Sequence, residues 1–360
     1  MVAVPIIISL DALGTLIKVK GCVGTQYRTA LVHYLSQRAQ QNDVIKSLLQ
    51  ESPQPVTPHV QSLFATDAVF EKTAFRFMKE ETDHIRDDVW ERIQKKDDSF
   101  RANPTQCIPS TRKEIPFCGM QHATAILYWK KVVHRTCTAE EVHVPHPIKK
   151  EEDAVRAAVA ELVEAELTHA RRVYQYNDAS PWDGFLQHVV TVVFRSSKPY
   201  ELLPHVTEFF EKLTEWNAKQ KEKIKAHSDD DKKDVFLYLS EKPFVLTNSD
   251  ENGKYALQDF LAKTNGELPF ADVITSVEVG VGKPSGEGLR YIADRVMGKS
   301  EPSFHFSRQY IHVGDEEADR LASEACGALY LPCLPEEGVS WPLIEKGLVE
   351  LEVRNRELLQ

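Results

Sequence analysis

Short apolar runs recur towards both ends of the chain and predict the strands of a parallel sheet. They are separated by helix-like segments and occupy residues 5–10, Phe244–Leu246, Val273–Ile274, Tyr310–Val313 and Ala328–Leu331. Strands that are buried on both faces and alternate with helices are typical of a parallel α/β sheet. We therefore expect an α/β core built from the beginning and the last third of the chain.

The middle of the chain, from about Cys22 to Phe194, has few strand signals and predicts a helical insertion. It contains three long amphipathic stretches, Gln61–Lys95, Met120–Val133 and Glu151–Val173. The segment Asn103–Pro116, with three prolines and no periodicity, predicts an irregular loop. Further along, residues 217–235 are strongly charged and predict a solvated helix end and loop.

Length, charge and cysteine content limit the classes of protein and of binding partner that this chain can represent. The 360 residues are long enough for about two domains. A formal net charge of -10 argues against nucleic acid and anionic membranes as partners. No stretch approaches the roughly 18 apolar residues of a membrane span. No Lys or Arg precedes the first apolar run, and the six cysteines form no C-x-x-C pair. A cytoplasmic protein with reduced thiols is the default expectation, and organellar delivery, for example to mitochondria, stays open.

Polar residues follow the first of these runs, where ligand sites of parallel sheets lie. Asp11 comes directly after the strand, and Gly14 provides a tight turn before Thr15. An aspartate in this place can act as a nucleophile or a metal ligand. It can equally cap the following turn, and the residues alone leave both interpretations open.

A hydroxyl and an amide follow the second run. Thr247 and Asn248 can donate to phosphate oxygens beside a helix N-terminus. They can also form the N-cap of a helix that starts near Glu251. Lys283 lies in the glycine-flanked turn Gly280–Gly286, where it can give fixed positive charge to an anion or point into solvent. Because a proline follows the lysine and the glycine spacing fails, this turn is not a P-loop.

Two carboxylates, Asp315 and Asp319, follow the strand Tyr310–Val313 at a spacing of four residues. Oxygen ligands of this kind suit a hard cation such as Mg²⁺. The alternative is that both acids cap the next helix.

Taken in this order, the four motifs resemble those of the haloacid dehalogenase superfamily of phosphoryl-transferring hydrolases. Its first motif, Asp-x-Asp-x-Thr, is similar to the run from Asp11 to Thr15, and its fourth is similar to Gly314-Asp315 with Asp319. Thr247 and Lys283 resemble the second and third motifs. The resemblance implies a three-layer Rossmann-like core over about residues 1–20 and 196–360, with an enlarged α-helical cap over residues 21–195.

Short echoes in the cap resemble most the eukaryotic subfamily called haloacid dehalogenase-like hydrolase domain-containing protein three. They are Gly24-Thr25-Gln26-Tyr27 and Pro181-Trp182-Asp183 with Val189-Val190. For the core, the resemblance implies a role for each matching residue. Asp11 would attack phosphorus, and Thr247 and Lys283 would hold the transferring oxygens. A small phosphorylated substrate would also contact Asn248, Gly14 and Thr15. A Mg²⁺ site would be provided by Asp11, the carbonyl of Leu13, Asp315 and Asp319.

The chain departs from the first motif at Leu13, where the superfamily has a second aspartate. That aspartate protonates the leaving alcohol and then activates water, and general acid–base help of this kind contributes roughly 10²- to 10⁴-fold. Three interpretations stay open. The chain is an atypical phosphohydrolase acting on good leaving groups or borrowing an acid from the cap. It is a silent binding or assembly protein whose enlarged cap contacts a protein partner. Or it is a 2-haloacid dehalogenase, against which Asp315 and Asp319 count because halide chemistry needs no cation.

Overall fold

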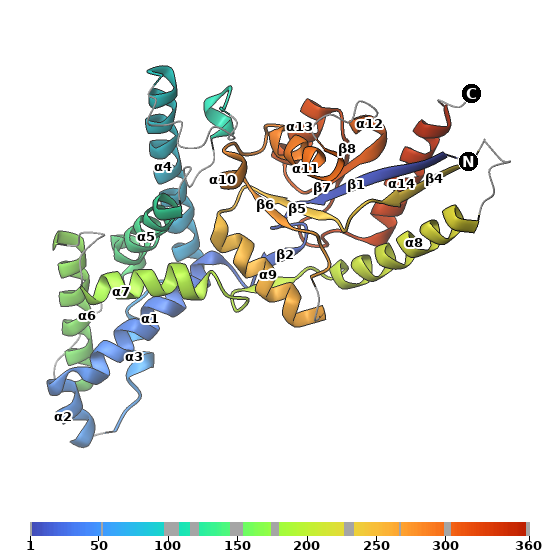
Figure 1. Cartoon of the computed structure of the whole chain (residues 1–360). Helices are drawn as coiled ribbons and strands as arrows, with labels where there is room; N and C mark the ends of the chain where they lie inside the picture. The colour runs from blue at the N-terminus through green and yellow to red at the C-terminus, as the bar shows by residue number, and fades with distance from the viewer. Residues whose placement is uncertain are drawn as a thin grey trace. The chain divides into compact units, whose positions relative to one another are not determined.

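The computed structural model describes residues 2–51, 53–96, 108–115, 122–144, 154–173, 180–226, 234–265, 268–298 and 304–357. The chain divides into two compact units. Unit 1 comprises Met1–Lys18, Ile85–His122 and Ser196–Gln360, and unit 2 comprises Val19–His84 and Ala123–Arg195. Unit 1 carries the parallel sheet and unit 2 is helical (Figure 1). The segment Ile85–His122, which the sequence analysis placed in the cap, therefore groups with the sheet.

Within the described residues, the main sheet has six strands in the order β6-β5-β1-β7-β8, with β4 also paired to β1. All the recorded pairings are parallel. The strands are β1 (Val2–Leu10), β4 (Val235–Leu239), β5 (Phe244–Thr247), β6 (Val273–Thr275), β7 (Tyr310–Gly314) and β8 (Leu329–Pro332). The predicted α/β class is confirmed. Chain order reverses on the two sides of β1, and open parallel sheets bind ligands at such a switch point.

Helices cover both faces of this sheet and make it the middle of three layers. On one face, α11 (Glu287–Met297) and α13 (Glu317–Cys326) pack with Tyr310 of β7 in one apolar cluster. On the other, α14 (Trp341–Arg356) approaches so closely that a Cβ at Gly347 would lie 2.6 Å from the Leu331 side chain. Because both faces are covered, β1 is apolar almost throughout and is buried from Ile6 to Leu10.

The remaining elements of unit 1 are shorter or flank the sheet. Strands β2 and β3 form a separate two-stranded sheet, and α8 packs against β4 and α14. Their bounds are β2 (Ile17–Val19), β3 (Tyr200–Leu202), α8 (Val206–Ala226), α9 (Glu251–Asn265), α10 (Ser276–Val279) and α12 (Phe306–Gln309).

Unit 2 is built from helices whose apolar faces meet in their own core. In this unit α1 packs against α2, α3 and α6, and the rings of Tyr34, Trp182 and Phe185 contact one another. The helices are α1 (Val23–Gln41), α2 (Asp43–Glu51), α3 (Val56–Ser62), α4 (Asp67–Gln94, whose last turns belong to unit 1), α5 (His122–Thr138), α6 (Ala154–Val173) and α7 (Pro181–His188), followed by a π-helical turn at Val189–Val193.

Regular structure occurs in both the predicted helix end and loop at 217–235 and the predicted irregular loop Asn103–Pro116. Of residues 217–235, the first part continues α8 to Ala226, Val235 begins β4, and 227–233 lie outside the described residues. Of Asn103–Pro116, the described residues 108–115 include a 3₁₀ turn at Arg112–Glu114, and the carbonyl of Glu114 accepts a hydrogen bond from Gly282 N at 2.8 Å. In the part of the chain that the structure describes, no helix has the length and apolarity needed to cross a membrane.

Candidate active site

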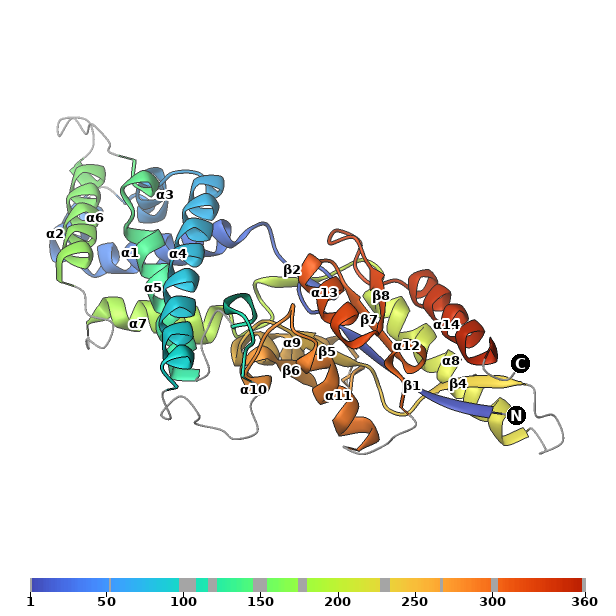
Figure 2. The same cartoon turned by 90° about the horizontal axis from the view of Figure 1, so that it is seen from above.

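Three carboxylates predicted separately from the sequence meet at the carboxyl ends of two neighbouring strands. Asp11 follows β1, Asp315 follows β7, and Asp319 lies in the first turn of α13. One oxygen from each lies within 4.8 Å of the others, and among the described residues this is the group of acids that could hold a metal ion. The strands β1, β5 and β7 run side by side to this edge (Figure 2). The site therefore sits at the switch point of the sheet.

Lys283 connects two of these acids. Its Nζ lies 2.5 Å from Asp11 Oδ1 and 2.5 Å from Asp319 Oδ1, and it also donates to the carbonyl of Leu246 at 3.1 Å. The ammonium is buried and all three of its partners are oxygens. The interpretation of Lys283 as a solvated loop lysine is therefore wrong, and its charge is fixed inside the acid cluster.

The turn that carries Lys283 is held by the side chain of Asn248. Asn248 Oδ1 accepts from the backbone N of Lys283 at 2.8 Å, and Nδ2 donates to the Lys283 carbonyl at 3.0 Å. A Cβ at Gly282 would approach Asn248 Oδ1 to 2.9 Å, so glycine allows this close contact. Asn248 thus places the lysine, whereas Thr247 is buried and its Oγ1 accepts from Ser249 N at 3.1 Å.

Asp11 is buried, and its burial opposes ionisation of the carboxyl group. Its backbone N donates to the carbonyl of Val313 at 2.8 Å, which ties the first motif to β7. Burial raises the pKa of Asp11 above its ordinary value, Lys283 opposes the rise, and Asp319 adds to it. Positive charge brought into the cluster would favour the ionised carboxylate that a nucleophile requires.

Asp315 lies against the turn of the first motif. Gly14 has φ +77° and a Cβ there would meet Asp315 Oδ2 at 2.2 Å, while Thr15 Oγ1 donates to Asp315 Oδ1 at 3.4 Å. Burial, and then the charges of Glu316 and Asp319, raise the pKa of Asp315 to about 6. Leu13, in the same turn, exposes 46% of its surface.

Asp319 makes the helix-capping contact that the sequence offered as an alternative, together with contacts inside the site. Its Oδ2 accepts from Glu316 N at 3.2 Å in a capping box, and its Oδ1 accepts from Lys283 and lies 3.0 Å from His312 Nε2. Burial opposes ionisation of Asp319, but Lys283 and His312 outweigh it and hold the pKa of this carboxyl below its usual range.

Two residues of this network were missed by sequence reasoning, namely Ser9 and His312. Both are fully buried residues of strands, Ser9 in β1 and His312 in β7, and Ser9 Oγ lies 2.8 Å from His312 Nδ1. Burial lowers the pKa of His312. A polar residue inside an otherwise apolar strand was the signal available, because buried polar groups almost always have specific partners.

The acid cluster has the chemistry that a divalent cation requires. Three carboxylates against one ammonium leave a formal charge of about -2 when all are ionised. All the available donors are oxygens, as Mg²⁺ prefers, and opposite ligands around it are about 4 Å apart. A separation of at most 4.8 Å between oxygens needs only a small movement to meet that geometry. The residues present therefore fit Mg²⁺.

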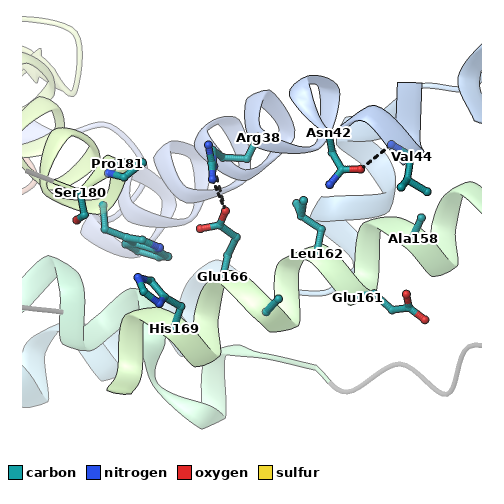
Figure 3. A pocket seen from close by; sticks show the side chains of 12 residues that line it. Arg38, Asn42, Val44, Ala158, Glu161, Leu162, Glu166, His169, Ser180 and Pro181 are labelled. Atoms are coloured by element: carbon teal, nitrogen blue, oxygen red, sulfur yellow. Dashed lines mark hydrogen bonds and ion pairs between the residues drawn. The ribbon is translucent and has the colours of Figure 1, made fainter. Parts of the chain in front are cut away.

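A separate pocket lies entirely within unit 2, between α1, α6 and the start of α7 (Figure 3). It has a volume of about 500 Å³, and Arg38 crosses it to Glu166 with Nη2 and Nε at 2.7 and 3.0 Å from Oε1. The pairing neutralises the guanidinium, and Glu161 adds a further acid to the wall. This pocket is therefore a poor match for a phosphate dianion. Its lining residues are Arg38, Asn42, Val44, Ala158, Glu161, Leu162, Ala165, Glu166, His169, Ser180, Pro181 and Trp182.

Comparison with known proteins gave distant structural likenesses. No family model matches the chain, and no curated protein matches it. A hydrolase of the haloacid dehalogenase superfamily (subfamily IA, variant 1) from Geobacter sulfurreducens PCA is 17% identical, with a TM-score of 0.30, over 51% of this chain and 78% of that one. A superfamily hydrolase from Ehrlichia chaffeensis is 14% identical, with a TM-score of 0.29, over 57% of this chain and 82% of that one. The α/β assignment accordingly rests on the strand order and register described above.

Proposed function

We propose that this chain is a Mg²⁺-dependent phosphohydrolase of the haloacid dehalogenase type, atypical because Leu13 replaces the general acid. The observation that carries the proposal is the meeting of Asp11, Asp315 and Asp319, with the buried ammonium of Lys283 bonded to Asp11 and Asp319. A nucleophilic carboxylate, a fixed cation and further carboxylate ligands are the parts that phosphoryl transfer requires.

In the proposed reaction Asp11 attacks the phosphorus of a small phosphorylated substrate. One carboxylate oxygen of Asp11 forms the new O–P bond while the bond to the leaving oxygen breaks, which gives an aspartyl-phosphate. Since Lys283 already holds Oδ1, we assign the attack to Oδ2. Lys283 and Thr247 would stabilise the transferring oxygens, and water would later release phosphate from Asp11.

Mg²⁺, held by Asp11, Asp315, Asp319 and the Leu13 carbonyl, would neutralise phosphate charge. The residues around it determine which substrates react. With a leucine side chain at position 13, this turn offers no proton to the leaving oxygen. We therefore expect substrates whose leaving groups depart as stable anions, such as aryl or acyl phosphates, in place of simple alkyl phosphates.

The testing experiment measures Mg²⁺-dependent turnover of an activated aryl phosphate and a panel of metabolite phosphates. We compare wild type with Asp11→Asn, Leu13→Asp and Leu13→Asn, where the last variant matches the size of aspartate without its acid. We expect Asp11→Asn to abolish turnover. Leu13→Asp should raise turnover of alkyl phosphates by roughly 10²-fold or more, and Leu13→Asn should not.

The other interpretations make different predictions in the same assay. A silent wild type that Leu13→Asp rescues would indicate a pocket disarmed at one residue. Silence in every variant would contradict the hydrolase and favour a binding or assembly protein that contacts a protein partner through the helices of unit 2. Release of halide from a 2-haloacid without added Mg²⁺, lost in Asp11→Asn, would favour a dehalogenase.

A further inference from the structure

The pair Ser9–His312 is a polar feature in the middle of an apolar sheet. Ser9 of β1 and His312 of β7 are partners in the parallel register, so their side chains share one face, and neither is exposed to solvent. Their neighbours Ile8 and Ile311 are buried apolar residues of the kind expected in such strands. A polar pair buried at this depth destabilises the fold unless its hydrogen bonds are satisfied.

The contacts of His312 determine which of its nitrogens carries the proton. Its Nε2 lies 3.0 Å from Oδ1 of Asp319, and an ionised carboxylate can only accept a hydrogen bond. Nε2 must therefore be the donor. In a neutral ring Nδ1 is then an acceptor, to which the hydroxyl of Ser9, 2.8 Å away, can donate.

The same bond fixes a carboxylate of the acid cluster. Three donors surround Asp319: Lys283 Nζ at 2.5 Å and His312 Nε2 at 3.0 Å on Oδ1, and Glu316 N at 3.2 Å on Oδ2. A Cβ at Gly314 would meet Asp319 Cγ at 2.2 Å, so the carboxylate also lies directly on the backbone of β7. His312 approaches this group from a position that is fully buried from solvent.

We propose that His312 is a positioning residue: oriented by Ser9, it donates from Nε2 to Asp319 and holds that carboxylate in place for Lys283 and the cation. The part of this inference that concerns cation binding rests on the proposed function. The part that concerns the orientation of Asp319 by His312 does not. Outer partners of this kind, which orient a ligand without touching the metal, typically change metal affinity roughly 10- to 100-fold when removed.

The first readout is the protonation pattern of the ring, which does not depend on activity. In protein labelled with ¹⁵N-histidine, we expect one resonance pair, absent in His312→Gln, with a protonated Nε2 and a bare Nδ1. Replacing Ser9 with alanine should shift that Nδ1 resonance. A ring protonated on Nδ1, or a resonance pair that Ser9→Ala leaves unmoved, would overturn the proposal.

The second readout is cation affinity, measured by calorimetry with Mg²⁺ and by luminescence with Tb³⁺. The variant His312→Phe keeps a ring and removes both nitrogens, and His312→Gln restores a donor near Asp319. Ile311→Ala, a cavity variant of a buried neighbour on the opposite face of β7, controls for loss of stability. We expect His312→Phe to weaken binding roughly 10- to 100-fold, His312→Gln to recover most of it, and Ile311→Ala to bind as wild type.

The outcomes separate this inference from the proposed function. If wild type binds Mg²⁺ and turns over but His312→Phe and Ile311→Ala bind it equally well, His312 is a packing residue and the inference fails alone. If wild type binds no cation while the ring shows the Nε2–H form and responds to Ser9→Ala, the phosphohydrolase fails and the orientation of Asp319 by His312 stands.

Discussion

At the scale of single residues, Gly14 combines a left-handed backbone conformation with close contact to the acid cluster. It has φ +77°, and a Cβ there would lie 2.2 Å from Asp315 Oδ2. Gly327 has φ +76° with nothing within 4 Å of such a Cβ, so Gly327→Ala is a matched control for backbone strain. Each alanine costs about 1–2 kcal/mol for the left-handed conformation. Only Gly14→Ala should also displace Asp315 and weaken Mg²⁺ binding, by roughly 10-fold or more.

Calorimetric titration with Mg²⁺ beside chemical denaturation checks this expectation. Suppose that both variants lose the same stability while only Gly14→Ala loses Mg²⁺ affinity. That result would support a cation site that includes Asp315. A Gly14→Ala protein that binds Mg²⁺ like Gly327→Ala would remove Asp315 from the site.

The same scale shows what the sequence could and could not predict about the site. Asp11, Lys283, Asp315 and Asp319 were found because they follow apolar runs, and the ends of parallel strands meet at one edge. Single-residue patterns could not show that Lys283 would lie between two carboxylates, since its turn reaches the site only through the fold. His312 was missed because it lies inside a strand, where the pattern was read only for its apolar residues.

At the scale of elements, the apolar runs predicted β1, β5, β6, β7 and β8 of the main sheet and missed β4. The sequence of that strand, VFLYL, is apolar throughout, but it directly follows a charged run that dominated the interpretation of this region. Periodicity reveals which residues of an element are buried. Periodicity does not give the register of strand pairing, so it could not predict that β1 pairs with both β4 and β5.

Element packing in unit 2 depends on a close approach at Gly24, the second residue of α1. A Cβ there would lie 2.2 Å from the carbonyl of Asp67 and 2.4 Å from the N of Glu71, both backbone atoms of α4. Thr25 Oγ1 also donates to Asp67 Oδ2 at 2.9 Å, which anchors the two helix starts together. We expect Gly24→Ala to force α1 and α4 apart and to cost about 1–3 kcal/mol.

A second helical glycine provides the opposite control. At Gly184 in α7 a new Cβ would meet nothing within 4 Å, so Gly184→Ala should stabilise the protein by about 0.5–1 kcal/mol through helix propensity. Thermal and urea denaturation of both variants measure whether each substitution raises or lowers the free energy of unfolding. A Gly24→Ala protein as stable as wild type would mean that α1 and α4 separate at no cost, which would contradict tight packing at this position.

At the scale of the whole molecule, binding of Mg²⁺ should stabilise one unit directly. All three carboxylates of the cluster belong to unit 1, whose strands β1 and β7 carry two of them at their ends. A ligand at 100 times its Kd adds about 2.7 kcal/mol to the folded state that binds it. Amide hydrogen exchange resolves where that stabilisation appears, because protection rises in the segments whose opening breaks the site.

We expect added Mg²⁺ to slow exchange in peptides from β1 and β7, and to leave peptides from α1 and α6 of unit 2 unchanged. Asp315→Asn is the matched control, since it keeps the size of the side chain and removes one ligand charge from the cluster. Slowing that persists undiminished in Asp315→Asn would place the cation elsewhere. Equal slowing in both units would mean that the chain opens as one cooperative body, so that stabilisation of the sheet reaches the helices as well.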